Sequence, residues 1–370
     1  MVPSRDLLRV TDAGLWCEAG DFFVDPWLPV DRAIVTHAHA DHARAGSARY
    51  LAASEGVSLL AHRLPGARIE GAAWGERRVL NGVTVSLHPA GHIRGAAQVR
   101  VEHRGEVWVV SGDYKRDADP TASAFEVVTC HTFITEATFA LPVYRWLPVP
   151  VLIADIVAWA TDVRSRGGCA ILLTYTLGKA QRLLAELAPL VDAPVLVHGA
   201  VEPLNTLYRA AGVALAPTQL VRDTGRENRQ RRALVLAPPT AAVPGWLRRF
   251  HEPETAFASG WMRLRGTRRR RALDRGFAIS DHADWPALLR TILETGASRV
   301  LATHGDSAAL VRLLAERGLD AGALATRFSG DGGEAAEDSE TASGGEDAHG
   351  EGGTPDAADG DTPGGAWPQP

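Results

Sequence analysis

The stretch from Thr36 to His42 constrains this chain more than any other. It places three histidines and one aspartate in the spacing H-x-H-x-D-H, directly after the apolar run 33–35, which predicts a buried strand. Alternate residues of a strand point the same way, so His37 and His39 can face one point in space. If the chain then turns into a helix, Asp41 and His42 approach a second point nearby. Such a mixed nitrogen and oxygen donor set suits two divalent cations.

Further candidate ligands follow strand-like segments downstream. His92 comes after the run 83–87, Asp113 after the run 107–110, and His304 after the run 299–302. Each lies where a predicted strand ends and a loop begins, which is where rigid scaffolds present functional side chains. Any one of them alone could be an ordinary core or surface residue. The repeated order of strand and then ligand favours a shared site.

The order of predicted elements indicates one α/β fold interrupted by another. Residues 1–140 alternate short strands with a helix, as expected for the first part of a layered α/β sandwich. Residues 141–271 alternate helices and strands in their own right, which predicts a parallel sheet covered by helices. Residues 272–328 return to the first fold and complete it. We expect the inserted domain to form a lid over the metals, since ligand pockets often lie between domains.

The charge of the chain is unevenly distributed. Residues 329–370 are rich in small residues and contain eleven acidic residues and no Lys or Arg, a composition that predicts a disordered tail. The other 328 residues hold 33 acidic and 39 basic side chains, although the whole chain has a net charge of −5. The folded body is therefore basic, and its charge is the one that bears on partners.

Arginines supply most of this positive charge and concentrate in two places. They are the run Arg268 to Arg271 and the scattered group Arg222, Arg226, Arg229, Arg231 and Arg232. Charge runs are more often solvated surface than binding sites. Beside two metals they are also candidates for contacts with a nucleic-acid backbone, because cationic side chains replace the counterions condensed on phosphates.

The composition is that of an ordinary water-soluble protein. Hydrophobic residues make up 45% of the chain, and the mean hydropathy is −0.08. No run of about 20 apolar residues and no charged-then-apolar leader is present, so we expect no membrane association and a cytoplasmic location. The three cysteines are unclustered and odd in number, which fits a reducing compartment. The oligomeric state does not follow from the sequence.

The motifs together resemble the β-CASP branch of the metallo-β-lactamase superfamily, whose nucleases include the Artemis and the cleavage-and-polyadenylation groups. The chain is most similar to the bacterial DNA ligase-associated exonucleases, also described as messenger RNA 3′-end-processing-like proteins. The likeness covers about residues 5–328 and leaves the tail outside. It rests on Asp25, the cluster from His37 to His42, His92, Asp113, Glu136, the segments 175–181, 259–261 and 281–284, and His304.

The resemblance implies an αββα metallo-β-lactamase sandwich, formed by residues 1–140 and 272–328, with a β-CASP-like α/β domain inserted at 141–271. It also implies the roles of the candidate residues. One metal would take His37, His39 and His92, and the other Asp41, His42 and His304, with Asp113 between them. Asp25 would orient these ligands by accepting hydrogen bonds, although an aspartate before proline is also a common turn former.

Glu136 and His282 match the acidic and histidine motifs of the branch. The resemblance implies that this pair protonates the leaving oxygen or holds the scissile phosphate. Two cations about 3.5–4 Å apart can generate hydroxide from a shared water and neutralise charge on a phosphoryl centre. His282 is chemically suited to be the general acid, because a carboxylate partner sustains a protonated imidazole near neutral pH. The resemblance implies that Asp41 and Asp113 act in catalysis as metal ligands.

The substrate and the metal follow less directly. A histidine at the position of His304 is usual in RNA-cleaving members of the branch, which argues for RNA. The closer overall likeness argues for DNA, for exonuclease action in DNA repair, and for a functional link to an ATP-dependent DNA ligase. We favour DNA over RNA. Nitrogen-rich ligation favours zinc, with manganese as the alternative activating ion.

Two other classes of function remain open. A hydrolase of small esters would need neither the arginine-rich insertion nor the pair of Glu136 and His282. A catalytically inactive scaffold would be expected to have lost ligands, and none of the seven is missing here. The segment around Gly178 and Lys179 lacks the glycine and hydroxyl spacing of a phosphate-binding loop, so we expect it to begin a helix of the inserted domain that faces phosphate.

Overall fold

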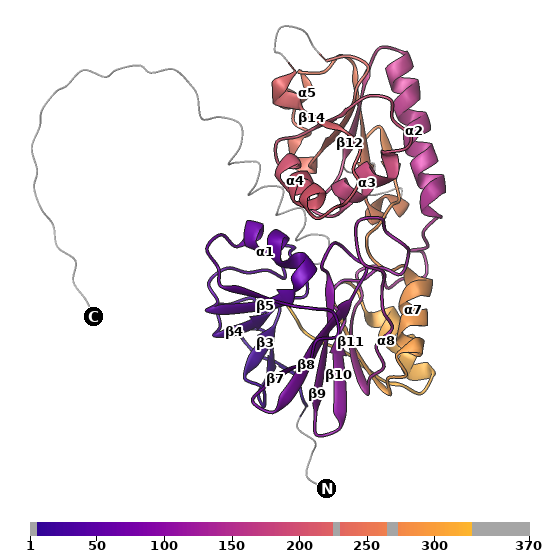
Figure 1. The fold of residues 1–370 in the computed structure, drawn as a ribbon. Coiled ribbons are helices and arrows are strands. Elements are labelled where there is room, and N and C mark those ends of the chain that lie inside the picture. Colours follow the sequence, from indigo (N-terminus) through magenta and orange to yellow (C-terminus); the bar gives the residue numbers. More distant parts are fainter. Residues whose placement is uncertain (1–5, 225–229, 265–272, 328–370) are drawn as a thin grey trace, which may run out of the picture.

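Three β-sheets organise the described part of the protein, two packed together in one part of the molecule and the third in a separate part (Figure 1). The computed structural model describes residues 6–224, 230–264 and 273–327. Arg226, Arg229, the run from Arg268 to Arg271 and the predicted tail at 329–370 lie outside these residues. No helix in the described ranges is long and apolar enough to cross a membrane.

The first sheet carries the strand that precedes the histidine cluster. Its strands lie in chain order and are β1 (Arg9–Val10), β2 (Leu15–Cys17), β3 (Phe22–Val24), β4 (Arg32–Ile34), β5 (Arg49–Ala53) and β6 (Ile69–Ala72). The short helices η1 (Ser54–Gly56) and α1 (Val57–Arg63) follow β5 and cover the outer face. The chain after β4 forms a turn and not the helix considered above: the amides of His42 and Ala43 both donate to the carbonyl of His39. After this turn the chain returns to the sheet, where β5 pairs with β4 in parallel.

The second sheet packs face to face with the first. In spatial order its strands are β19 (Asp320–Ala323), β18 (Arg299–Thr303), β11 (Thr132–Glu136), β10 (Glu106–Val110), β9 (Ala97–His103), β8 (Val83–Pro89) and β7 (Arg78–Leu80). Helices α7 (Trp285–Glu294) and α8 (Ala308–Glu316) cover its outer face. Alternate residues of each strand point to opposite faces of the sheet, so each strand contributes side chains to two hydrophobic cores. Trp108 and Val110 face the first sheet, whereas Val109 between them packs toward the helices.

The third sheet is entirely parallel. Its spatial order is β14 (Thr218–Leu220), β13 (Val195–Val197), β15 (Leu234–Ala237), β12 (Cys169–Leu173), β16 (Pro253–Ala258) and β17 (Arg275–Phe277). It is accompanied by the helices α2 (Val149–Ser165), α3 (Lys179–Leu187), α4 (Glu202–Ala210) and α5 (Pro244–Leu247), and by the short helices η2 (Val221–Asp223), η3 (Pro239–Ala241) and η4 (Gly260–Arg263). Both faces are covered, which is why its central strands read as continuous apolar runs. The predicted parallel sheet is confirmed.

The third sheet is inserted between two strands that are neighbours in the second. β11 and β18 pair in parallel with Glu136 opposite Thr303, although more than 160 residues separate these two partners. The predicted α/β sandwich with an inserted α/β domain is therefore confirmed. The insertion limits of 141 and 271 stay a prediction, and β17 continues the third sheet to Phe277.

Candidate metal centre

The candidate ligands gather at one edge of the sandwich. β10, β11 and β18 are adjacent and parallel, so the residues that follow their carboxyl ends meet there. This brings Asp113, Glu136 and His304 together, opposite the histidine turn after β4. Gly112 permits the approach: its φ is +54°, and a Cβ at this position would lie 2.7 Å from Cβ of Thr36.

The first group of ligands consists of three imidazoles whose nitrogen atoms converge. Nε2 of His37 and Nε2 of His92 each lie 3.1 Å from Nδ1 of His39. The other nitrogen of each ring carries a proton and donates it to an oxygen outside the group. Nδ1 of His37 donates to Oγ1 of Thr36, and that hydroxyl donates to Asp25. Nε2 of His39 donates to the carbonyl of Leu177. Nδ1 of His92 donates to the carbonyl of Asp281.

This arrangement leaves three lone pairs facing one point. Burial strongly lowers the pKa of His37 and of His92, and it lowers the pKa of His39 to about 3. The rings are therefore neutral, and each has one donor nitrogen and one acceptor nitrogen. Three acceptors about 3 Å apart repel one another unless a cation lies between them. Neutral imidazoles held by such hydrogen bonds are the usual ligands of zinc.

The second group combines two imidazoles with a carboxylate. Nε2 of His42 lies 3.3 Å from Nε2 of His304 and 3.7 Å from Oδ2 of Asp41. Nδ1 of His42 donates to Oδ2 of Asp25 over 2.7 Å, and the amide of Thr36 donates to the other oxygen of the same carboxylate. Asp25 thus fixes the ring of His42 with Nε2 toward the group. His304 has a φ of +62°, a strained backbone of the kind found at functional sites.

Asp113 lies between the two groups. Its Oδ2 is 3.6 Å from Nε2 of His37 in the first group and 3.6 Å from Nε2 of His42 in the second, and its Oδ1 is 3.8 Å from Nε2 of His304. Oδ1 accepts no hydrogen bond from any residue in the described ranges. A buried carboxylate oxygen without a donor fits a cation on each side, so the donor set matches two divalent ions.

Charge in the second group is balanced by a proton in the metal-free protein. Burial lowers the pKa of His42, but the carboxylates of Asp41, Asp113 and Asp25 outweigh this and raise it to about 10. Burial raises the pKa of Asp113 to about 7. The same carboxylates that hold a proton on His42 would hold a cation in its place.

We expect the metal-free protein to be most stable near pH 6.5–7, close to the ordinary pKa of histidine. Below pH 6.5 the unfolded chain protonates four imidazoles that burial keeps neutral in the fold, so stability falls by up to about 1.4 kcal/mol per pH unit for each. These four are His37, His39, His92 and His304. Asp113 opposes this loss of stability, because its raised pKa lets the fold bind a proton that the unfolded chain does not, but it is one group against four. Above pH 6.5 the stabilisation from His42 declines, because the fold keeps the proton up to a pKa of about 10 while the unfolded chain gives it up.

Urea denaturation of chelator-treated protein between pH 5 and 9 measures this dependence. Zinc-loaded protein serves as the control, because bound metal holds the rings deprotonated. An unfolding free energy of the metal-free protein that keeps rising as the pH falls from 6.5 to 5 would contradict the assignment of neutral buried rings.

His282 and Glu136 form a hydrogen-bonded pair beside the first group. Nδ1 of His282 donates to Oε2 of Glu136 over 2.8 Å, and Oε1 of Glu136 accepts from the amide of Tyr114 over 2.7 Å. Both side chains are buried, and the ring of His282 lies 4.6 Å from the ring of His92. Nδ1 of His282 is also 4.0 Å from Oδ2 of Asp113, so these three side chains form a further group that could hold a metal.

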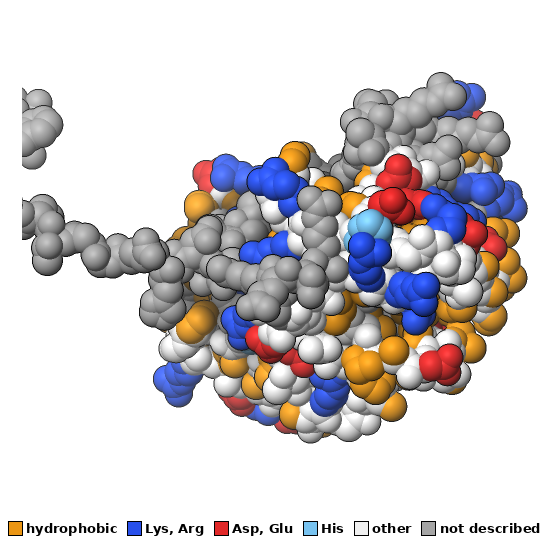
Figure 2. Space-filling view, turned by 90° about the horizontal axis from the view of Figure 1, so that it is seen from above, with side chains coloured by type: hydrophobic (Ala, Val, Ile, Leu, Met, Phe, Trp, Pro, Cys, Tyr) orange, Lys and Arg blue, Asp and Glu red, His pale blue; other side chains and the backbone are white. Residues whose placement is uncertain are grey.

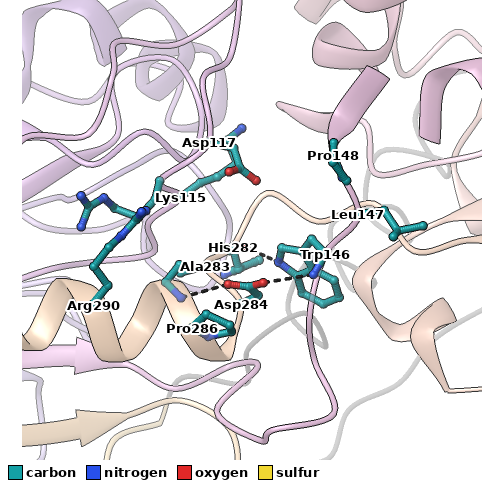
Figure 3. Close-up of a pocket in the computed structure, with 12 residues that line it drawn as sticks. Lys115, Asp117, Trp146, Leu147, Pro148, His282, Ala283, Asp284, Pro286 and Arg290 are labelled. Atoms are coloured by element: carbon teal, nitrogen blue, oxygen red, sulfur yellow. Dashed lines mark hydrogen bonds between the residues drawn. The ribbon is translucent and has the colours of Figure 1, made fainter. Parts of the chain in front are cut away.

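A cavity of about 380 Å³ opens beside His282, where the inserted domain meets the sandwich (Figure 3). Trp146 forms part of its wall, and its indole nitrogen donates to the carbonyl of His282. The amide of Trp146 donates to Asp284, which also caps the N-terminus of α7. Arg290 lies on the same cavity wall. The cavity is large enough for part of a nucleotide chain, and His282 is the member of the site that lines it.

The structure places two of the predicted arginines away from the metal ligands. Arg231 and Arg232 precede β15, so in a parallel sheet they lie at the edge opposite to the one that leads into Leu177. From above the inserted domain, basic side chains are scattered among acidic ones on the visible surface (Figure 2). Arg231 and Arg232 therefore give no support to a nucleic-acid contact near the metals, whereas Arg222 follows β14 at the edge that leads into Leu177.

Sequence reasoning missed a buried charged cluster next to the first group. It consists of Lys115, Asp119, Lys179, Arg182 and Asp281. One signal could have revealed it: Lys115 and Lys179 are the only lysines of the chain, and both are buried. Lysine is rarely fully buried unless it is paired, so two lysines in a chain that otherwise uses arginine deserved a structural explanation.

Comparisons with known proteins agree with this fold. Residues 9–131 match the model of the metallo-beta-lactamase superfamily. A protein of Opitutus terrae named "Probable DNA ligase" is 33% identical over 320 residues, which are 84% of this chain and 30% of that protein. Endoribonuclease ysh-1 of Neurospora crassa is 29% identical over 119 residues, which are 31% of this chain and 14% of the relative. Endoribonuclease YSH1 of Gibberella zeae is 30% identical over 122 residues, with 32% and 14% covered. The chain thus spans less than a third of the length of each relative.

Proposed function

Because the chain carries a metallo-β-lactamase domain with a second α/β domain inserted before that fold is complete, we propose that it is a metal-dependent nucleic-acid phosphodiesterase. The observation that carries the proposal is the pair of ligand groups with Asp113 between them and with His282 and Glu136 beside them. Seven buried side chains with the chemistry of metal ligands, in this arrangement, support a catalytic centre over a binding scaffold.

The chain's own residues supply most of the proposed chemistry. Two divalent cations, when bound, supply Lewis-acid activation of water and neutralise charge on the phosphoryl oxygens. His37, His39 and His92 would hold one ion, and Asp41, His42 and His304 the other, with Asp113 shared. Asp25 orients His42 and Thr36. We propose zinc as the resident ion, because five of the seven ligands are imidazoles.

His282 is proposed as the general acid. His282 is among the residues that line the cavity, and its ring is held by Glu136, so we propose that a proton on Nε2 is delivered to the oxygen that leaves phosphorus. Glu136 stabilises the protonated ring and keeps Nδ1 as a donor. A hydrolase of small esters would find no use for this pair, since it needs no such acid beside a wide cavity.

DNA is the proposed substrate, with exonuclease action in DNA repair. Support comes from the relative named "Probable DNA ligase", which matches 84% of this chain. The same match supports a functional link between this activity and an ATP-dependent DNA ligase. The alternative is an RNA-processing nuclease, supported by the endoribonuclease names of the shorter matches and by the histidine at position 304.

Cleavage of matched end-labelled strands separates these alternatives. We expect single-stranded DNA to be shortened stepwise from one end, with cleavage lost after chelation and restored by Zn²⁺ or Mn²⁺. RNA of the same sequence should be cleaved more slowly. Faster cleavage of RNA would favour the RNA-processing alternative. Internal cuts in the DNA strand would contradict exonuclease action. No cleavage of either strand by metal-loaded protein would contradict the proposed function.

A further inference from the structure

The segment that links β12 to α3 brings the inserted domain against the first ligand group. We call residues 175–182 the docking segment. Its Leu177 carbonyl accepts the proton on Nε2 of His39, over 3.3 Å and across 138 positions of sequence. That hydrogen bond leaves Nδ1 of His39 as the acceptor that faces His37 and His92. The ring orientation of a sandwich histidine is therefore set by a backbone atom of the inserted domain.

A second ligand of the same group is set at the other junction between the domains. Nδ1 of His92 donates to the carbonyl of Asp281 over 2.8 Å, where the chain returns from the insertion. The side chain of Asp281 is bound from the docking segment, because Nη1 of Arg182 donates to its Oδ1 and to the carbonyl of Ser280, both over 2.8 Å. The position of the Asp281 carbonyl thus depends on Arg182.

Buried charges hold this junction closed. Lys179 of the docking segment and Lys115 of the sandwich lie 3.6 Å and 3.8 Å from the carboxylate of Asp281, and Arg182 lies 3.6 Å from Asp119. Burial alone would raise the pKa of Asp281, but the three cations lower it and keep the group ionised. Separating the domains would leave several of these buried charges without partners, which is costly.

Gly178 lets the docking segment approach the ligand loop. Its φ is +84°, and a Cβ at this position would lie 2.2 Å from Cγ2 of Ile93, the residue after His92. The side chain of Ile93 is branched at Cβ, so this methyl group cannot easily rotate away. In the second group, by contrast, His42 donates to Asp25, which follows β3 of the sandwich. The two ligand groups therefore differ in their dependence on the inserted domain.

We propose that docking of the inserted domain and metal binding at the first group are thermodynamically coupled, with Leu177, Gly178, Arg182 and Asp281 as positioning residues. The inference rests on the proposed metal-dependent function. Partners that orient metal-binding histidines typically contribute 10–100-fold to metal affinity. Coupling is reciprocal, so metal at the first group must strengthen docking by the same factor that docking strengthens metal binding.

Zinc titration of the full-length protein with a competing chelator tests the coupling. In Gly178→Ala we expect one of two zinc equivalents to weaken by about 10–100-fold, with the other unchanged. Gly212→Ala is the matched control, because its φ is also +84° but a Cβ there meets nothing within 4 Å. Adding Ile93→Ala to Gly178→Ala should restore part of the lost affinity. The variant His304→Ala, which lacks a second-group ligand, identifies the equivalent that belongs to the first group.

Hydrogen exchange in the unaltered protein provides a second measurement that does not depend on the folding of a variant. The reporters are the amides of Ala180 and Arg182, which donate to the carbonyls of Tyr175 and Gly178. We expect zinc at the first group to slow their exchange. Unchanged exchange, or equal weakening of both zinc equivalents in Gly178→Ala, would overturn the coupling.

These outcomes are distinct from a failure of the proposed function. A protein that binds two zinc ions and cleaves nucleic acid, yet shows neither effect, contradicts the coupling alone. A protein that binds no zinc contradicts both.

Discussion

Replacing His37 by alanine is expected to reduce phosphodiester hydrolysis by at least about 10³-fold, the upper end of the cost of removing one charge-stabilising group. Nε2 of His37 lies 3.1 Å from Nδ1 of His39 and 3.6 Å from the shared Asp113, so its loss opens the first group and weakens the bridge to the second. We expect the purified variant to hold about one metal equivalent in place of two.

Cleavage of an end-labelled DNA strand and elemental analysis of the same preparations measure both effects. His103→Ala is the matched control, because His103 is part of no ligand group and bonds only weakly, over 3.3 Å, to the carbonyl of Gly82. Undiminished turnover in His37→Ala would remove the site assignment. A variant that loses both turnover and its folded circular dichroism signal would require the milder His37→Gln in its place.

His282→Ala is expected to lower the rate by about 10²–10⁴-fold while the protein keeps both metals. The reason is that Nδ1 of His282 bonds to Glu136, which leaves Nε2 to serve the leaving oxygen. Because Asp113, Glu136 and His282 could also hold an ion together, metal content decides between the two roles. A fall by one equivalent would make His282 a ligand.

A substrate with an activated leaving group sharpens this test. A nitrophenyl ester of a nucleoside phosphate releases nitrophenolate, which departs without a proton. We therefore expect His282→Ala to lose far less rate on the nitrophenyl ester than on DNA, and Glu136→Gln to show a smaller loss in the same direction. Equal losses on both substrates would mean that His282 holds the phosphate and does not act as the acid.

Much of the fold could be predicted from the sequence because central strands are buried on both faces. The strands before Asp113, Glu136 and His304 read as apolar runs, and these runs located the ends where side chains converge. The strands that the sequence did not predict are β6, β7, β14, β17 and β19. Each lies at the edge of a sheet and is half exposed, so it lacks the apolar signal.

The candidate ligands could be proposed from sequence because metal-binding side chains have a recognisable chemistry. Their orientation could not, because two of the groups that fix it are backbone carbonyls, those of Leu177 and Asp281. A carbonyl is common to every residue and leaves no mark in the sequence. The expectation that the segment around Lys179 faces phosphate is not supported either, since Lys179 is buried and faces Asp281.

The metal content of the purified protein tests the central claim most directly. Elemental analysis of protein prepared without added chelator should find about two equivalents of divalent transition metal per chain, one for each ligand group that shares Asp113. His37→Ala and His304→Ala should each remove one. A protein that takes up no transition metal, even after reconstitution with Zn²⁺ or Mn²⁺, would contradict the account.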